Sequence, residues 1–309
     1  MPIDWLATLD SMPAVGYALS AVLGLIIGSF LNVVIHRLPR MLYAQWALDA
    51  AAWQEDVATG TSASTQGRHE PLTPAAPSAS SPASPSAPPA PPDRELTLSR
   101  PGSHCPHCGH RLSPSELIPL VSWLVQGGRC RACRTPIGIT YPLVELISAL
   151  AFVVLTWRFG LGAQALASMA MVSLLIALAV IDHQTRLLPD ALTQPLIWTG
   201  LLVNVQTLIV PLEAAVIGAA AGYLSLWLVH HAFRRLTGRE GMGYGDFKLL
   251  AGLGAWLGWT ALPGIVLMAS AGGTLYGVTR VLLRRQHRHE PIAFGPWLVL
   301  GGLVLLWTS

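Results

Sequence analysis

The chain has 309 residues, of which 52% are hydrophobic and only 11% are charged. Soluble globular proteins carry about 25% charged residues, so this composition excludes a soluble single domain and also a wholly disordered chain. The net charge of +3 is too small to indicate a nucleic-acid partner. We therefore predict an all-α polytopic membrane protein whose surface contacts membrane lipid.

The predicted membrane spans are apolar runs near the ~20 residues that a helix needs to cross the hydrocarbon core. The first covers 13–35 and contains no charged residue. No Lys or Arg precedes it, since the first basic residue is Arg37. It therefore lacks the basic start of a cleavable signal peptide, and we interpret it as a retained span. The later runs cover 141–157, 163–181, 191–210, 212–233, 249–259, 262–283 and 292–307. Together the runs predict about eight transmembrane helices.

The basic residues predict the orientation of these helices. With the N-terminus outside, the cytoplasmic segments are 36–140, 182–190, 234–248 and 284–291. Every Lys and Arg except Arg158 lies in or beside one of them. Because cytoplasmic loops carry an excess of Lys and Arg, we expect both termini to lie outside the cytoplasm.

The large cytoplasmic insertion between the first two helices has two parts. Residues 36–98 include a stretch, 71–92, made almost entirely of Pro, Ala and Ser, which is typical of an extended linker. Residues 99–140 have a different composition and are predicted to form a small domain. The remaining 141–309 is predicted to be a seven-helix membrane domain.

All four cysteines lie in the small domain, as two Cys-x-x-Cys pairs: Cys105 with Cys108, and Cys130 with Cys133. This spacing is typical of a Cys₄ zinc site. Two disulfides are the alternative, but a reducing cytoplasm disfavours them. Three histidines lie among the first pair, at His104, His107 and His110. Four thiolates already close a structural site, so we interpret the histidines as lying beside the metal rather than binding it.

Two aspartates, Asp182 and Asp246, are the candidates for chemistry, since an ionisable residue at a membrane span is costly and often functional. Asp182 ends a long apolar run, and Asp246 lies between Gly245 and Phe247 just before the sixth span. Both are expected at the cytoplasmic face, where two carboxyl groups that meet share a proton and act as acid and base. Taken singly, Asp246 also fits a helix cap, and Asp182 an interfacial anchor near Arg186.

The motifs resemble those of the type IV prepilin peptidases, the leader peptidases and N-methyltransferases of bacterial inner membranes. The matching segments are GSFLNVVIHRLP at 28–39, the cysteine segment at 99–147, DHQTRLLPD at 182–190, GYGDFK at 243–248 and FGP at 294–296. In DHQTRLLPD and GYGDFK, the resemblance identifies Asp182 and Asp246 as the catalytic residues. In DHQTRLLPD the last residue, Asp190, is predicted to cap the next helix.

This resemblance implies an aspartic endopeptidase that cleaves the basic leader of prepilins and pseudopilins after a Gly, on the cytoplasmic side. It also implies that the enzyme then methylates the new N-terminus with S-adenosylmethionine, and that the zinc is structural. Methyl transfer rests on the resemblance alone, because the chain has no glycine-rich dinucleotide fingerprint.

Two alternatives remain. One is a peptidase of the same type without methyltransferase activity. The other is an ion-coupled transporter, which would more naturally place its carboxylates near the membrane midplane within a repeat pair. We find no internal repeat in the sequence.

Overall fold

The computed structural model describes residues 13–58, 96–238, 242–283 and 293–308. In these residues the chain is helical, with two isolated β-bridges and no strand, which confirms the predicted all-α fold. The predicted linker at 71–92 lies outside the described residues. The eight long helices are α2 (Pro13–Ala58), α4 (Thr140–Phe159), α5 (Ala163–Thr185), α6 (Asp190–Asn204), α7 (Leu212–Thr237), α8 (Tyr244–Leu257), α9 (Leu262–Leu282) and α10 (Gly295–Thr308).

Five of these helices, α2, α4, α5, α7 and α9, are long and apolar enough to cross a membrane. The other three have 14 or 15 residues, or about 21–23 Å at 1.5 Å per residue. The shortness of α8 follows from its place in the fold. It packs against α6, α7 and α10, and every residue from Asp246 to Leu257 except Lys248 is buried. It therefore forms the centre of the C-terminal bundle.

Helix α2 is longer than the predicted span at 13–35, because it continues through Pro39 to Ala58. Polar residues mark where a chain leaves the membrane, but they do not end a helix. Residues 41–58 are rich in the helix formers Ala, Leu and Gln, so the helix continues through them. Near residue 97 the chain again lies beside α2. There the Arg37 guanidinium donates hydrogen bonds to the carbonyl oxygens of Thr97, at 2.9 Å, and Leu98, at 3.3 Å.

Helices α2 and α4 pack closely because two glycines of α2 face α4. A Cβ at Gly24 would lie 2.6 Å from the Ala149 Cα, and one at Gly28 would lie 2.7 Å from the Glu145 Cα. Small residues four positions apart let helix backbones approach in a membrane, where packing rather than water drives association. A buried hydrogen bond between the Ser20 and Thr156 hydroxyls lies along the same interface.

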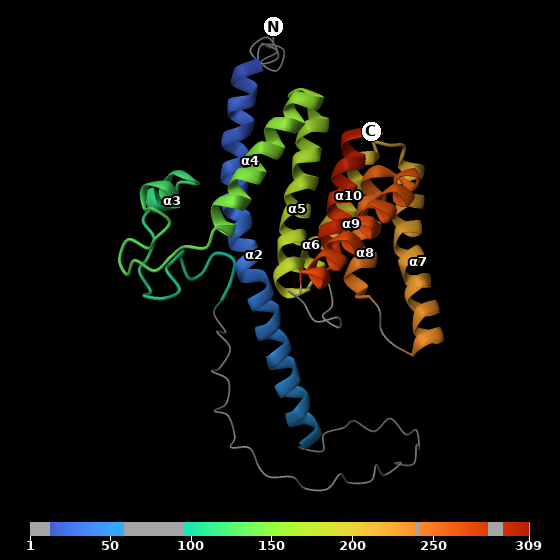
Figure 1. Ribbon diagram of the computed structural model, residues 1–309, viewed down its shortest axis with the longest axis horizontal. Coiled ribbons are helices and arrows are strands. Elements are labelled where there is room, and N and C mark those ends of the chain that lie inside the picture. The colour runs from blue at the N-terminus through green and yellow to red at the C-terminus, as the bar shows by residue number, and fades with distance from the viewer. Residues whose placement is uncertain (1–12, 59–95, 239–241, 284–292, 309) are drawn as a thin grey trace.

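Helix α5 lies at the centre of the molecule, between the α2–α4 pair and the bundle of α6 to α10 (Figure 1). Its inward-facing aliphatic residues, such as Leu175, Leu178 and Ile181, are fully buried. Figure 1 shows the C-terminal end of α5 and the N-terminal ends of α8 and α10 at the same end of the bundle. This arrangement brings three chain segments that are distant in sequence to one place.

Candidate functional site

Asp182 lies in the last turn of α5, which ends where Arg186 adopts a left-handed conformation with φ of 57°. The aspartate is only 5% exposed. Its Oδ2 accepts a hydrogen bond of 2.9 Å from the backbone N–H of Gly295, the first residue of α10. Arg186 and His183 interact with Asp182 through their charges. An interfacial anchor exposed to the membrane surface would not be buried in this way.

Asp246 is the third residue of α8 and is 8% exposed. The capping position of this helix is occupied by Gly243, and no side chain caps the helix. Asp246 is therefore not the capping residue itself, but its carboxylate interacts with the backbone of Gly243 at the capping position. Asp246 is also under the influence of the Asp182 charge, which comes from the last turn of α5 at the same end of the bundle. Two buried carboxyl groups that interact in this way can hold one proton between them, which provides an acid and a base.

The sequence reasoning missed Gly295, whose contact with Asp182 spans 113 positions of the chain. The sequence signal for Gly295 was the short FGP run at 294–296. This run resembles a family motif, but by itself it indicates no role for the glycine.

Asp190 and Lys248 join the two aspartate segments by an ion pair. The Lys248 ammonium donates to both carboxylate oxygens of Asp190, at 2.6 and 2.8 Å. The prediction that Asp190 caps α6 is wrong, since Pro189 occupies the capping position and Asp190 is the first helical residue. The ion pair therefore links Asp190, at the start of α6, to Lys248 in α8.

The four cysteine sulfurs come together, and all lie within 4.8 Å of one another. The Sγ atoms of Cys105 and Cys133 are 3.8 Å apart, and those of Cys108 and Cys130 are 3.9 Å apart. A tetrahedron with zinc–sulfur distances of about 2.3 Å has sulfurs about 3.8 Å apart. No pair is disulfide-bonded. The donor set therefore fits a tetrahedral thiolate-bound metal ion.

Each cysteine pair sits on a tight turn of the same design. In the first, the Gly109 N–H donates to the Cys105 carbonyl, and in the second, the Arg134 N–H donates to the Cys130 carbonyl. Gly109 and Arg134 both have positive φ, at 72° and 60°. The arginine at the matching place shows that the second turn adopts this conformation without a glycine.

Polar neighbours favour the thiolate form at one ligand. Hydrogen bonds with the hydroxyl and backbone of Thr135 lower the pKa of Cys133 to about 6. The thiolate is the form that binds metal, and the cluster does not favour it at every position, since burial and the neighbouring cysteines raise the pKa of Cys108 to about 11.

Two of the three histidines, His104 and His110, have other partners. His104 Nδ1 is hydrogen-bonded to the Gly102 carbonyl, and His110 Nε2 lies 3.4 Å from the Glu116 carboxylate. That carboxylate also accepts hydrogen bonds from the Ser113 backbone and hydroxyl, which hold the pKa of Glu116 below its usual value. In the described residues, the metal-compatible group contains the four cysteines and no histidine.

Glu145 connects the cysteine domain to the membrane helices. It is buried in α4, and its carboxylate accepts a 2.8 Å hydrogen bond from the Leu120 N–H. Leu120 precedes the short helix α3 (Val121–Val125) and has a positive φ of 57°. Glu145 thus holds a strained turn of the cysteine domain against α4.

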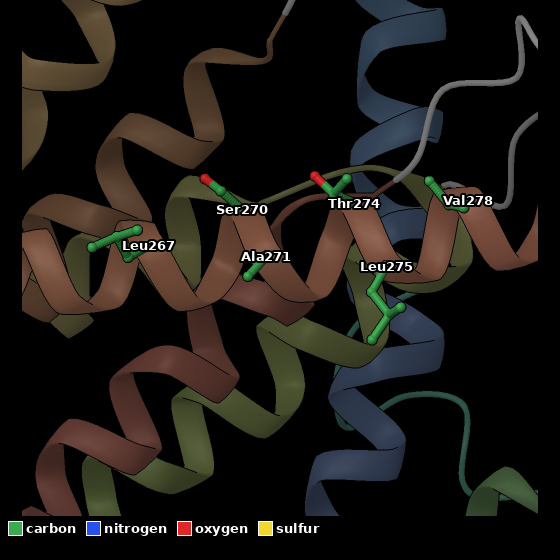
Figure 2. Close-up of a pocket in the computed structure, with 6 residues that line it drawn as sticks. All are labelled: Leu267, Ser270, Ala271, Thr274, Leu275 and Val278. Atoms are coloured by element: carbon green, nitrogen blue, oxygen red, sulfur yellow. The ribbon is translucent and has the colours of Figure 1, made fainter.

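The structure also has an open groove of about 530 Å³ along one face of α9 (Figure 2). It is lined by Leu267, Ser270, Ala271, Thr274, Leu275 and Val278. The lining contains no ionisable side chain, so the groove provides no acid or base.

Two family models match this chain. The Bacterial Peptidase A24 N-terminal domain matches residues 22–159, which include the cysteines, and the Type IV leader peptidase family matches residues 169–278, which include both aspartates. No solved structure matches the chain.

Several curated proteins are similar to the chain over nearly its whole length. A protein of Aeromonas hydrophila is 45% identical over 297 residues, which cover 96% of this chain and 92% of the relative. One of Dickeya chrysanthemi is 45% identical over 97% of this chain and 95% of its own. One of Burkholderia pseudomallei (strain K96243) is 44% identical over 94% of this chain and 84% of its own. Each is named prepilin leader peptidase/N-methyltransferase.

Proposed function

We propose the function of this chain from one premise: it belongs to the type IV leader peptidase family. On that premise it is a membrane aspartic endopeptidase that cleaves the basic leader of type IV prepilins and pseudopilins after a Gly. It then methylates the new N-terminus with S-adenosylmethionine, as the names of its relatives indicate for those proteins. Its substrates are prepilins of the kind that gave the relatives their name.

The observation that carries the proposal is the proximity of Asp182 and Asp246. The two residues come from different helices, are almost fully buried, and interact through their charges. Burial excludes bulk water, which strengthens the electrostatic influence of each carboxyl group on the reacting atoms. We propose that these two residues are the catalytic pair.

In the proposed mechanism, one carboxylate takes a proton from a water molecule while the water oxygen attacks the carbonyl carbon of the scissile peptide. The other carboxyl group gives its proton to the carbonyl oxygen. The tetrahedral intermediate then collapses: one of its hydroxyl groups returns a proton to the second carboxylate as the C=O bond re-forms, the C–N bond breaks, and the proton taken from water passes to the leaving amine. The pair returns to holding a single proton.

The site is proposed to face the cytoplasm from the bacterial inner membrane. The basic residues support this side, since they gather in the segments that the topology places inside. The cysteine domain and both aspartates then lie on the side where a basic leader would remain. The domain is proposed to extend over 99–140, between the first span and the seven-helix membrane domain at 141–309.

The four cysteines are proposed to hold one structural Zn²⁺. All four positions of the tetrahedron are occupied by protein sulfurs, which leaves no open coordination position for a substrate. A bound zinc ion would cross-link the two turns and so stabilise the fold of the domain. Methyl transfer is supported by the relatives' names, and we derive no step of it from these residues.

The test is cleavage of a prepilin by membranes that contain the full-length chain. We expect Asp182→Asn and Asp246→Asn each to lower kcat by at least about 10³-fold, because each removes an acid–base group while keeping its shape. The matched control is Asp190→Ala, an aspartate at the same end of the bundle. It loses only a half-exposed ion pair worth about 1 kcal/mol or less, so cleavage should persist. Cleavage by either asparagine variant at the wild-type rate would refute the two-aspartate mechanism.

The product of the same reaction tests methyl transfer. Product mass measured with and without S-adenosylmethionine should differ by one methyl group. A cleaved product that never gains this mass would identify the chain as a peptidase without methyltransferase activity.

A further inference from the structure

The N-terminus of α10 makes direct contact with the Asp182 carboxylate. The Gly295 N–H donates to Oδ2 at 2.9 Å, and the bond is buried. A Cβ built on Gly295 would lie 2.6 Å from the same oxygen and 3.2 Å from the carboxyl carbon. The backbone of α10 therefore lies where a side chain at position 295 would collide with the aspartate.

The contact satisfies both partners. The first N–H groups of a helix have no acceptor within the helix, and a helix N-terminus carries a partial positive charge. A buried carboxylate needs a donor to offset the loss of water. In the described part of the chain, the Gly295 N–H is the one hydrogen-bond donor to this carboxylate.

The other groups that act on Asp182 do so through charge alone. His183 lies in the last turn of the same helix, Arg186 is the residue at which that helix ends, and Asp246 lies in the first turn of α8. In its described range, α10 has no titratable side chain. The orientation of the Asp182 carboxylate is thus set by a backbone group of α10 rather than by another side chain.

We infer that Gly295 is a positioning residue for the proposed peptidase site, and that it acts through Asp182. Its N–H fixes which way the carboxylate faces, and its missing side chain allows the helix end to come this close. The inference rests on the proposed function, because it assigns Gly295 a role in the same reaction.

The kinetic test compares Gly295→Ala with the wild type in prepilin cleavage. The added methyl group should displace the Asp182 carboxylate. A small misplacement of a reacting group is expected to lower kcat by about 10²-fold. KM should stay within about twofold, since Gly295 contacts the aspartate and not the substrate. The control is Gly302→Ala on the same helix, whose Cβ meets the Leu253 side chain and not the aspartate or a backbone. This control should keep the wild-type kcat.

A stability cycle tests the contact without any activity measurement. Gly295→Ala should lower the unfolding midpoint of the protein by about 3 °C in the wild-type background. In the Asp182→Ala background it should lower it by less than about 1 °C. There the carboxylate is gone, and the nearest remaining contact is the residue 182 Cβ at 3.4 Å, an ordinary van der Waals distance. Equal losses in both backgrounds would overturn the inference.

The outcomes separate this inference from the proposed function. If Asp182→Asn abolishes cleavage while Gly295→Ala keeps the wild-type kcat, the function stands and the positioning role is wrong. If Asp182→Asn cleaves normally, the proposed mechanism is wrong and the kinetic role of Gly295 falls with it. In that case, a larger loss of unfolding midpoint for Gly295→Ala in the wild-type background than in the Asp182→Ala background would still support the contact. The contact would then stabilise the fold without a role in catalysis. A loss of kcat in Gly295→Ala together with that coupling supports the inference.

Discussion

Glu145 is a single residue on which the junction between the cysteine domain and the membrane helices depends. Its buried carboxylate accepts the N–H of Leu120, whose positive φ makes this turn strained. Asp182 is held in the same way by the N–H of Gly295. In both cases a buried carboxylate accepts a backbone N–H from a distant segment, so the bond fixes tertiary structure.

We expect Glu145→Ala to lower the free energy of unfolding by about 1–3 kcal/mol, since it leaves the Leu120 N–H without its acceptor. Hydrogen exchange should speed up in 118–126 before it does in α5. Glu145→Gln keeps an acceptor oxygen and should retain most of the protection. Glu213→Ala, at an exposed glutamate of α7, is the control and should change neither quantity. Unchanged exchange in Glu145→Ala would show that the turn is held by other contacts.

The sequence predicted some of these residues and not others for a physical reason. Ionisable and thiol groups are rare in so apolar a chain, so the sequence makes Asp182, Asp246 and the cysteines conspicuous. The cysteines of each pair are also close to each other in the sequence. The contact of Gly295 with Asp182 depends on how α10 packs on α5, which no local pattern encodes. The pairing of Asp190 with Lys248 was missed for the same reason, because it depends on the place of α8 beside α6.

Among the elements, the α2–α4 pair shows how helix packing positions the cysteine domain, since α4 follows that domain directly. The predicted spans of α4, α5, α7 and α9 agree with the helices to within a few residues, because apolar run length sets the length of a spanning helix. The prediction for α2 located the membrane-spanning part but not the extension to Ala58. Hydropathy indicates whether a helix segment lies in lipid or in water, but it does not indicate where the backbone hydrogen bonds of the helix end.

Gly28→Ala is expected to lower the free energy of unfolding by about 1–3 kcal/mol, because its Cβ would press on the backbone of α4 at Glu145. The matched control on the same helix is Gly16→Ala, whose Cβ meets only the side-chain end of Leu161. That control should be neutral or slightly stabilising, since Ala favours a helix over Gly. The unfolding midpoint in detergent measures both variants. Equal midpoints for the two variants would contradict the close-packing account.

At the scale of the whole molecule, the cysteine domain is small and has few buried apolar residues, whereas the membrane bundle has an extensive core. We expect chelation to remove one metal ion per chain and to unfold 99–140 while α5 to α10 stay protected from hydrogen exchange. Cys133→Ser should lose the metal in the same way, as measured by elemental analysis. Protection of 99–140 that survives metal removal would show that the domain folds without the ion.

The hydrogen bonds from Arg37 to Thr97 and Leu98 have a consequence for the length of the chain between them. They close a ring of chain whose base is fixed beside α2, so the length of chain between Arg37 and Thr97 enters the entropy of closing that ring. This entropy grows with the logarithm of loop length, and doubling the length costs only about 0.6 kcal/mol. A change in chain length between Arg37 and Thr97 is therefore expected to have little effect on where the cysteine domain begins beside α2.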